Sequence, residues 1–439
     1  MKDTPIDYDI VSQKIKESKL PSIGDASIRE IKKLIDQIER DTGKKFVRME
    51  MGIPGLPPTA IGVQAQKDAL DRGVAAIYPD IFGIPALKSE ISKFVKNYMD
   101  VDVDPEGCLP TVGSMQGSFA AFLTLNRMYK EREGTLFIDP GFPVHKQQLK
   151  VMGQEWDSFD VYNYRGDKLR DKLESYLATG RFCSVLYSNP NNPSWICFTE
   201  KELKIIGELA TKYNIVVIED LAYFAMDFRK DYSIPGHPPY QPTVAHYTNN
   251  WVLLISSSKA FSYAGERVGM MIVSDKLFDT TAPDLLRYYK SDNVGYAMIF
   301  GSIYSLSSGT PHSAQYALTA ILKAANEGRL NFLDVVKEYG EKAKIMKKMF
   351  LTNGFTIVYD KDEDEPIADG FYFTFAYPGF TGAQLIEKLL YYGISAITLD
   401  ITGSERHEGI RACVSLVKRS QFKDLEERLR KFNEDHREG

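Results

Sequence analysis

The residues with the clearest chemical potential follow the apolar run 251–255, where Ser256, Ser258, Lys259 and Arg267 stand close together. The run lacks polar alternation and predicts a strand buried on both faces, and α/β enzymes place their chemistry at the ends of such strands. A lysine beside apolar residues has a destabilised ammonium, so its amine can form a Schiff base with an aldehyde. The serines, as neutral donors, and the arginine, as a fork-shaped cation, suit a phosphate. A solvated loop lysine is the simpler interpretation of Lys259 taken alone.

The overall composition favours a small-molecule partner. The chain has 439 residues, and its 44% hydrophobic and 26% charged residues are typical of a globular enzyme. This length is enough for about two or three domains. The formal net charge of -5 gives no electrostatic argument for binding nucleic acid or an anionic membrane. We therefore expect neither of those partners.

The cysteines and the N-terminus indicate a cytoplasmic protein without a metal site. The four cysteines are scattered and show no Cys-x-x-Cys spacing, which argues against both a zinc site and a disulfide framework. Residues 1–7 include acidic side chains where a signal peptide needs an apolar core. No later apolar run approaches the length that spans a membrane.

The stretch around Lys259 also carries a family resemblance. Ser-x-x-Lys at 256–259, followed by Gly-x-Arg-x-Gly at 265–269, resembles the lysine signature of the pyridoxal-phosphate (PLP) aminotransferases of fold type I, the aspartate aminotransferase-like class I/II group. The resemblance implies that Lys259 forms a Schiff base with PLP. It also implies that Arg267 and the two serines of the stretch bind the cofactor phosphate.

A second polar cluster follows the apolar run 215–218, where Asp220 and Tyr223 stand in the sequence Asp-x-Ala-Tyr. A carboxylate at the end of a buried strand must be paired or hydrogen-bonded, because an isolated buried charge is costly. The resemblance implies that Asp220 pairs with the protonated pyridine nitrogen and that Tyr223 bonds the phenolic oxygen. Asp-x-Ala-Tyr favours aminotransferases over the related lyases, which often carry histidine in place of the tyrosine.

The turn after the predicted strand 135–138 reads Asp-Pro-Gly-Phe-Pro-Val-His and resembles the Pro-x-aromatic-Pro turn of the same family. The resemblance implies that Phe142 stacks on the pyridine ring and that His145 supports Asp220. A core histidine is the alternative interpretation of His145, and it comes close to the same role.

The loop after the predicted strand 183–187 reads Ser-Asn-Pro-Asn-Asn-Pro-Ser-Trp and resembles the family motif Asn-Pro-x-Asn-Pro-Thr-Gly. Its two Asn-Pro pairs impose a rigid, non-helical loop. The resemblance implies that Asn192 hydrogen-bonds the phenolic oxygen of the cofactor and the substrate carboxylate. Ser194 and Trp195 replace the Thr-Gly of the motif, which leaves the shape of the loop and of the substrate pocket open.

Two further segments are candidates for the cofactor phosphate. Gly113, Ser114 and Met115 open a predicted helix, and the unpaired backbone N–H groups at a helix N-terminus form a phosphate site. Tyr78 matches the tyrosine of the family stretch Tyr-x-x-x-x-Gly-x-Pro, which touches the cofactor phosphate of the neighbouring subunit. The resemblance thus implies a homodimer. A tyrosine packed at a turn is the alternative for Tyr78.

Two segments resemble the parts of the family that meet the substrate. Gly52 begins a Gly-x-Pro segment, which the family places beside the substrate, and Arg411 stands in a segment resembling the one whose arginine grips the α-carboxylate. Taken alone, the first reads as a linker and the second as a surface arginine. Dicarboxylate-specific relatives use a second arginine near 300–305, where this chain has none, so aromatic or other apolar amino acids gain weight.

The spacing of the motifs predicts how they come together. The intervals from Asn192 to Asp220 and from Asp220 to Lys259 are each close to one βαβ unit in length. Right-handed crossovers then bring the strand ends to one edge of a parallel sheet, and their loops converge on a crevice.

We therefore expect an α/β protein with two main domains. A three-layer α/β/α PLP-binding domain with a mainly parallel sheet is predicted at 51–325, and a smaller α+β domain at 326–439. Residues 1–50 are predicted to form an arm and a helix that pack with the small domain or with a partner subunit. A capping box at Ser27 and Glu30 marks the start of that helix.

The resemblance implies a PLP-dependent aminotransferase that moves an amino group from an L-amino acid, whether aromatic, aspartate or other apolar, to a 2-oxo acid such as 2-oxoglutarate. A PLP-dependent β-lyase or amino-acid decarboxylase on the same fold is the alternative. A PLP-binding transcriptional regulator would need an added DNA-binding module. The residues before Gly52 show one predicted helix and no basic helix-turn-helix.

Overall fold

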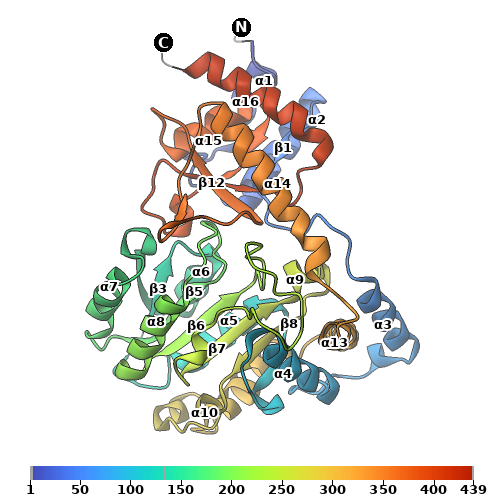
Figure 1. Cartoon of the computed structure of the whole chain (residues 1–439), viewed down its shortest axis with the longest axis vertical. Helices are drawn as coiled ribbons and strands as arrows, with labels where there is room; N and C mark the ends of the chain where they lie inside the picture. The colour runs from blue at the N-terminus through green and yellow to red at the C-terminus, as the bar shows by residue number, and fades with distance from the viewer. Residues whose placement is uncertain (1–2, 133, 438–439) are drawn as a thin grey trace. The chain divides into compact units, whose positions relative to one another are not determined.

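The computed structural model describes residues 3–132 and 134–437, which divide into two compact units (Figure 1). The smaller unit combines the residues up to Gly55, the short segment Asn192–Ile196 and the residues from Lys337 onward. The larger unit comprises Leu56–Asn191 and Cys197–Val336.

The larger unit is built on a seven-stranded sheet of order β2-β8-β7-β6-β5-β3-β4. Its strands are β2 (Cys108–Thr111), β3 (Gly134–Asp139), β4 (Glu155–Asp160), β5 (Phe182–Ser188), β6 (Val216–Leu221), β7 (Trp251–Ser256) and β8 (Gly269–Val273). The strands β7, β6, β5, β3 and β4 run parallel, whereas β8 pairs antiparallel with β7 and β2. Every residue of β3 and of β5 to β8 is buried. Because successive side chains point to opposite faces, both faces of this sheet are covered.

Helices supply that cover. The longer helices are α3 (Ala60–Asp71), α4 (Pro85–Met99), α5 (Gly113–Leu125), α6 (Pro143–Met152), α7 (Lys168–Leu177), α8 (Glu200–Tyr213) and α13 (His312–Asn326). Helix α5 packs on β7 and β8, and α13 packs on α3 and α4. The shorter helical segments are α9 (Ser257–Ala260), α10 (Asp275–Phe278), α11 (Val294–Tyr296), the π-helical turn η7 (Ala297–Ile303) and α12 (Tyr304–Ser307).

The smaller unit has an antiparallel sheet of order β14-β15-β12-β9. Its strands are β9 (Thr356–Ile357), β12 (Tyr372–Ala376), β14 (Ile397–Thr398) and β15 (Ile410–Cys413), and a separate parallel pair joins β1 (Val47–Arg48) to β13 (Ile394–Ser395). Its helices are α1 (Tyr8–Ser18), α2 (Ile28–Thr42), α15 (Gly382–Tyr391) and α16 (Phe422–His436). Helix α14 (Leu333–Thr352) begins in the larger unit and continues into the smaller one.

The predicted α/β fold with a mainly parallel sheet is confirmed. The capping box is also confirmed, because Ser27 Oγ accepts from the N–H of Glu30 and the Glu30 carboxylate accepts from the N–H of Ser27. Helix α1 lies in the segment that was expected to be an arm, where it packs on α2 and α15 with Val11 buried. The sequence analysis missed this helix because its apolar positions are few.

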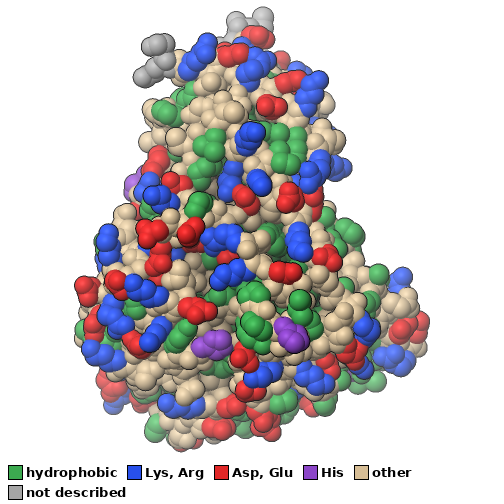
Figure 2. Space-filling model, in the orientation of Figure 1, with side chains coloured by type: hydrophobic (Ala, Val, Ile, Leu, Met, Phe, Trp, Pro, Cys, Tyr) green, Lys and Arg blue, Asp and Glu red, His purple; other side chains and the backbone are tan. Residues whose placement is uncertain are grey.

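The surface drawn in Figure 2 carries charges of both signs. Lys and Arg side chains are interspersed there with Asp and Glu side chains. Among the helices of the described residues, none is long and apolar enough to cross a membrane.

Candidate active site

Neighbouring parallel strands of the larger unit end beside one another and lead into loops with predicted site residues. In the sheet register, Ser188 of β5 lies opposite Asp220 of β6, which lies opposite Leu254 of β7. Tyr223 follows β6, and Lys259 follows β7. The predicted convergence of strand ends at one edge of a parallel sheet is therefore confirmed for these strands.

Hydrogen bonds tie the loops at this edge together. The N–H of Asn189, at the end of β5, donates to the carbonyl of Asp220 over 3.0 Å. The amide of Asn191 donates to the carbonyl of Pro140, in the turn after β3, over 2.7 Å. The loop after β5 is thus tied both to the end of β6 and to the turn after β3.

Asp220 is a buried carboxylate without an ionic partner. Its side chain accepts one hydrogen bond, from the N–H of Ala222, and only 5% of the residue is exposed. Burial raises the pKa of Asp220 to about 7. His145 Nε2 lies 3.8 Å from Asp220 Oδ2, and burial lowers the pKa of His145 to about 4, so the imidazole is neutral near pH 7. No Lys or Arg of the described chain pairs with Asp220, so its carboxyl group can accept a hydrogen bond from a cationic N–H group.

Phe142 and His145 lie together at the start of α6. Their ring centroids are 5.6 Å apart with the planes at 90°, an edge-to-face contact. Phe142 is the residue before Pro143, the first of the helix, and its side chain is half-buried. The structure therefore brings the predicted ring-stacking residue against the histidine that approaches Asp220.

Arg267 and the residues that begin α5, which are predicted to bind the cofactor phosphate, lie close together. Arg267 has a left-handed backbone (φ 50°), and its guanidinium lies so close to Gly113 that an added Cβ would be 2.5 Å from Nη2. A Cβ on Gly269 would likewise lie 2.9 Å from the backbone nitrogen of Ser114. Arg267 donates to the carbonyl of Ala264 and has no ion-pair partner among the described residues. An unpaired guanidinium beside helix N–H groups is suited to a phosphate.

Lys259 lies on the single turn α9, directly after β7. Ser256 Oγ accepts from the N–H of Ser258 over 3.1 Å and so caps this turn. Ser257 Oγ donates to the carbonyl of Val268, which ties the turn to the segment preceding β8. Lys259 is half-buried, so its amine combines partial desolvation with access.

In the smaller unit, Arg411 and Asn192 form a second cluster. Arg411 is only 2% exposed, and its Nη1 donates to Asn192 Oδ1 over 3.2 Å while Nη2 donates to the carbonyl of Glu50 over 2.7 Å. Its guanidinium lies 4.4 Å from the centroid of the Tyr372 ring. Nε has no hydrogen-bond partner, and no carboxylate pairs with Arg411 in the described parts of the chain. Neutral groups alone hold this buried cation, which leaves it able to bind an anion.

Gly52 belongs to the same cluster. A Cβ on Gly52 would lie 2.1 Å from the hydroxyl of Tyr372, so the backbone passes directly against that ring. Arg411 thus contacts Asn192 directly and is linked to Gly52 through the ring of Tyr372. These three residues, all predicted to meet the substrate, lie in one cluster.

Comparison with known proteins identifies the family. Residues 48–429 match the family described as aminotransferase class I and II. The chain belongs to this family.

Relatives of this aminotransferase-family chain are distant in sequence. A probable aspartate aminotransferase of Methanocaldococcus jannaschii is 24% identical over 59% of this chain and 64% of its own length. An aspartate aminotransferase of Pyrococcus horikoshii is 25% identical over 65% of both chains. An aromatic-amino-acid aminotransferase of Thermococcus litoralis is 26% identical over 55% of this chain and 60% of its own length. The matches thus span less than two thirds of those relatives.

Solved structures share the fold over nearly the whole chain. An alanine aminotransferase from Pyrococcus furiosus superimposes with a TM-score of 0.76 at 19% identity, covering 94% of this chain and 98% of its own. A mutant of the Thermus thermophilus aspartate aminotransferase gives 0.75 at 16% identity, covering 95% and 98%.

Tyr78 and Met115 are further predicted site residues of this family member, and both are exposed. Tyr78 is 90% exposed, and among the described residues no hydrogen bond or ring contact involves its side chain. Met115 is 39% exposed in the first turn of α5, and its carbonyl accepts from Gln148 and Ser118. Their roles stay predictions.

Sequence analysis missed two residues that hold Arg411. Tyr372 looks like any aromatic residue of an apolar strand, so nothing in the pattern distinguished it. Glu50 did give a signal, because a carboxylate between Met49 and Met51 suggests a buried, paired group. It bonds Arg48 and Ser395.

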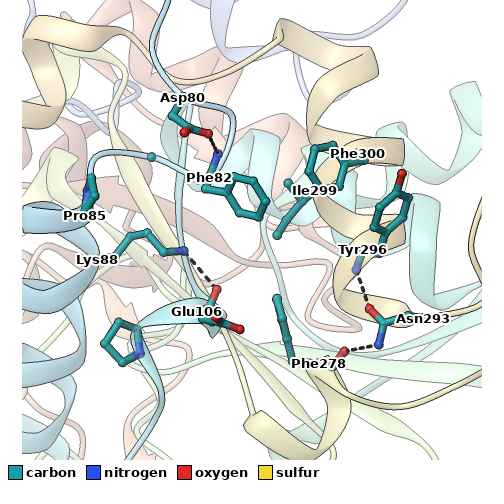
Figure 3. Close-up of a pocket in the computed structure, with 12 residues that line it drawn as sticks. Asp80, Phe82, Pro85, Lys88, Glu106, Phe278, Asn293, Tyr296, Ile299 and Phe300 are labelled. Carbon is teal, nitrogen blue, oxygen red and sulfur yellow. Dashed lines mark hydrogen bonds between the residues drawn. The ribbon is translucent and has the colours of Figure 1, made fainter.

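The larger unit also has a cavity of about 530 Å³ that none of the predicted site residues lines. Figure 3 shows an aromatic wall of Phe82, Phe278, Tyr296 and Phe300 on one side and Lys88 on the other. Lys88 Nζ donates to the carbonyls of Glu106 and Cys108, so backbone groups hold its amine in place.

Gly113→Ala is expected to disturb Arg267, because the added Cβ would lie 2.5 Å from Nη2 at a φ of 67°. Gly43→Ala is the matched control, since its φ is 68° and no atom lies within 4 Å of an added Cβ. Both variants should lose about 1–2 kcal/mol of unfolding free energy through backbone strain, measured by denaturant titration. Only Gly113→Ala should also weaken PLP binding, by about tenfold or more, measured by absorbance titration. Equal PLP affinity in the two variants would contradict the phosphate assignment.

Proposed function

We propose that this chain is a PLP-dependent aminotransferase that moves the amino group of an L-amino acid to a 2-oxo acid such as 2-oxoglutarate. The observation that carries the proposal is Asp220, a buried carboxyl group at the end of β6 with no Lys or Arg partner among the described residues, with Lys259 directly after the adjacent strand β7. Membership of the aminotransferase class I and II family supports it.

The residues of the larger unit fit PLP. The guanidinium of Arg267 and the N–H groups that begin α5 offer donors to the phosphate, and Gly113 and Gly269 leave room for them to approach one another. Asp220 offers the anion that keeps a pyridine nitrogen protonated, and pairing would lower the pKa of its carboxyl from about 7. When bound, PLP supplies an electron sink for the substrate carbon that loses its proton.

The roles of the protein groups follow from their chemistry. Lys259 holds the cofactor through its amine and then, once the substrate has displaced it, moves a proton at the substrate Cα. Tyr223 would donate to the phenolic oxygen of PLP, and Phe142, which His145 contacts edge to face, would pack on the pyridine ring.

Asn192 and Arg411 are assigned to the substrate carboxylate. Because Asn192 Oδ1 accepts from Arg411, the amide NH2 of Asn192 is directed to other acceptors, as its predicted donor role requires. The planar fork of Arg411 suits a carboxylate, and the neutral neighbours of this cation leave its charge uncompensated until substrate arrives.

The amino donor is proposed to be an aromatic amino acid, another apolar amino acid, or aspartate. Residues 300–305 contain no arginine for a second carboxylate, and Phe300 there packs on Tyr296 at 4.6 Å and on Phe82 at 5.1 Å. The lack of an arginine in this segment favours apolar donors. A panel of amino donors assayed with 2-oxoglutarate measures the preference. A β-lyase or decarboxylase would turn over without the 2-oxo acid, so dependence on the acceptor separates the two classes.

A homodimer is proposed as the active form. The 90% exposure of Tyr78 supports its predicted contact with another chain, and Phe82, Tyr296 and Phe300 form an exposed aromatic cluster on the same unit (Figure 3). Exposed apolar surface of this kind marks association sites.

Borohydride reduction of the PLP-loaded protein should fix the cofactor covalently to Lys259, because this amine is assigned to the cofactor aldehyde. Peptide mass spectrometry locates the modified lysine. Lys259→Ala should still bind PLP through Asp220 and the phosphate groups while turnover falls by orders of magnitude. Trapping on another lysine, such as Lys88, would overturn the assignment.

The two arginines should fail differently. Arg267→Ala should lose PLP, with activity partly restored by excess cofactor. Arg411→Ala should retain PLP while kcat/KM falls about a hundredfold or more, because each charge-assisted hydrogen bond contributes roughly 1.5–3 kcal/mol and 1.4 kcal/mol is about tenfold. Arg411→Lys should rescue little, since a point charge cannot reproduce the fork. Loss of PLP from Arg411→Ala would refute the carboxylate assignment.

Phe300→Glu should place a charge in the aromatic cluster and shift the protein toward monomer in analytical ultracentrifugation, with loss of activity. Val151→Glu is the matched control, because Val151 is an exposed apolar residue, at 69%, on α6. Tyr78→Phe should weaken PLP retention without abolishing turnover. A fully active wild-type monomer at assay concentration would exclude the dimer requirement.

A further inference from the structure

Trp195 stands in a backbone conformation that suits glycine. Its φ is 65°, in the left-handed region, where a residue with a Cβ is strained and glycine is not. Trp195 occupies the place of the glycine in the motif Asn-Pro-x-Asn-Pro-Thr-Gly. Strain of this kind persists only where surrounding contacts hold the residue in place. Strained residues of this kind cluster at functional sites.

The contacts that hold Trp195 lie within the smaller unit. The side chain is only 1% exposed, and the backbone of Gly370 lies against the indole so closely that an added Cβ would be 2.0 Å from Cε2. The indole thus fills the space that a side chain at position 370 would need.

The indole meets Tyr372, the ring that lies beneath Arg411. The centroids of Trp195 and Tyr372 are 6.2 Å apart with the planes at 68°, an edge-to-face contact. The hydroxyl of Tyr372 lies against the backbone of Gly52, so the ring is confined at both places. Its contact with the guanidinium of Arg411, at 4.4 Å, is a cation–π contact in a buried setting.

The segment Asn192–Ile196 therefore holds Arg411 in two ways. Asn192 accepts directly from Nη1, and Trp195 fixes the ring that supports the face of the guanidinium. A fork binds a carboxylate well only in one plane, so the ring beneath it controls affinity.

We propose that Trp195 is a positioning residue for Arg411, acting through Tyr372, and that it sets the affinity of this chain for the α-carboxylate of its substrate. The inference rests on the proposed function of Arg411. The glycine of the family motif has no side chain and therefore cannot perform this role.

The test uses the PLP-loaded protein and a probe that carries the carboxylate but not the amino group. The probe is 3-phenylpropanoate if phenylalanine is the best donor, or succinate if aspartate is. Trp195→Gly removes the indole at a backbone position that glycine tolerates. It should raise the Kd of the probe and the KM of the amino donor about tenfold while kcat and PLP retention stay within about twofold. Trp195→Phe, which keeps an aromatic ring, should recover most of the affinity.

Two further variants show whether the effect passes through Tyr372. Tyr372→Leu should weaken probe binding at least as much as Trp195→Gly. The double variant should bind the probe no more weakly than Tyr372→Leu alone, because the indole then has no ring to position. Trp251→Phe, in the buried strand β7 of the larger unit, is the control for loss of an indole and should lower stability without changing probe Kd.

An unchanged probe Kd in Trp195→Gly, or fully additive effects in the double variant, would overturn the inference. If Trp195→Gly does not fold, Trp195→Leu and the Tyr372 variants decide the question by the same measurements. Arg411→Ala distinguishes a failure of the positioning role of Trp195 from a failure of the proposed function. Probe binding that survives Arg411→Ala overturns the carboxylate assignment itself, whereas binding lost in Arg411→Ala but kept in every Trp195 variant overturns the positioning role alone.

Discussion

The cost of burying a charge is the constraint on which this structure depends. A charge removed from water needs a partner, and the predicted site residues of each unit include a buried charged group without an oppositely charged Lys, Arg, Asp or Glu partner among the described residues. In the larger unit the group is the carboxylate of Asp220, and in the smaller unit it is the guanidinium of Arg411. A buried anion and a buried cation that are satisfied only by neutral groups destabilise the free protein. Groups of this kind in a predicted site are candidates for binding a ligand of opposite charge.

Backbone proximity fixes the geometry around these charges. At Gly113 and Gly269 the missing side chains let the arginine and the N-terminus of α5 approach the end of the sheet. At Gly52 and Gly370 the missing side chains let Tyr372 and Trp195 close on the backbone. In each place an added Cβ would lie under 3 Å from a neighbouring atom. These close approaches around the predicted site residues are therefore possible only with glycine at the four positions.

The two clusters are held by different kinds of contact. The loops around Asp220 are joined by backbone and amide hydrogen bonds from Asn189 and Asn191, which resist displacement. Arg411 is held by two hydrogen bonds and a ring contact, and one of its nitrogens is left without an acceptor.

The sequence alone predicted the parts of this protein that depend on local pattern. Unbroken apolar runs identified the buried strands β5, β6 and β7, because a strand covered on both faces has no polar alternation. Asp220 and Lys259 follow those runs, and the sequence made them candidate site residues because the carboxyl ends of parallel strands meet at one edge of the sheet. Asn192 and Arg411 came from motif resemblance, and the structure brings them within hydrogen-bonding distance.

Only the tertiary structure revealed what surrounds Arg411. Glu50, Trp195, Tyr372 and Arg411 lie far apart in the sequence, and their contacts arise from packing that no local periodicity encodes. The sequence showed that Trp195 replaces a glycine, but not whether this disrupts the loop or completes it. The answer depends on the space that Gly370 leaves for the indole, and such complementarity between distant segments exists only once the chain is folded.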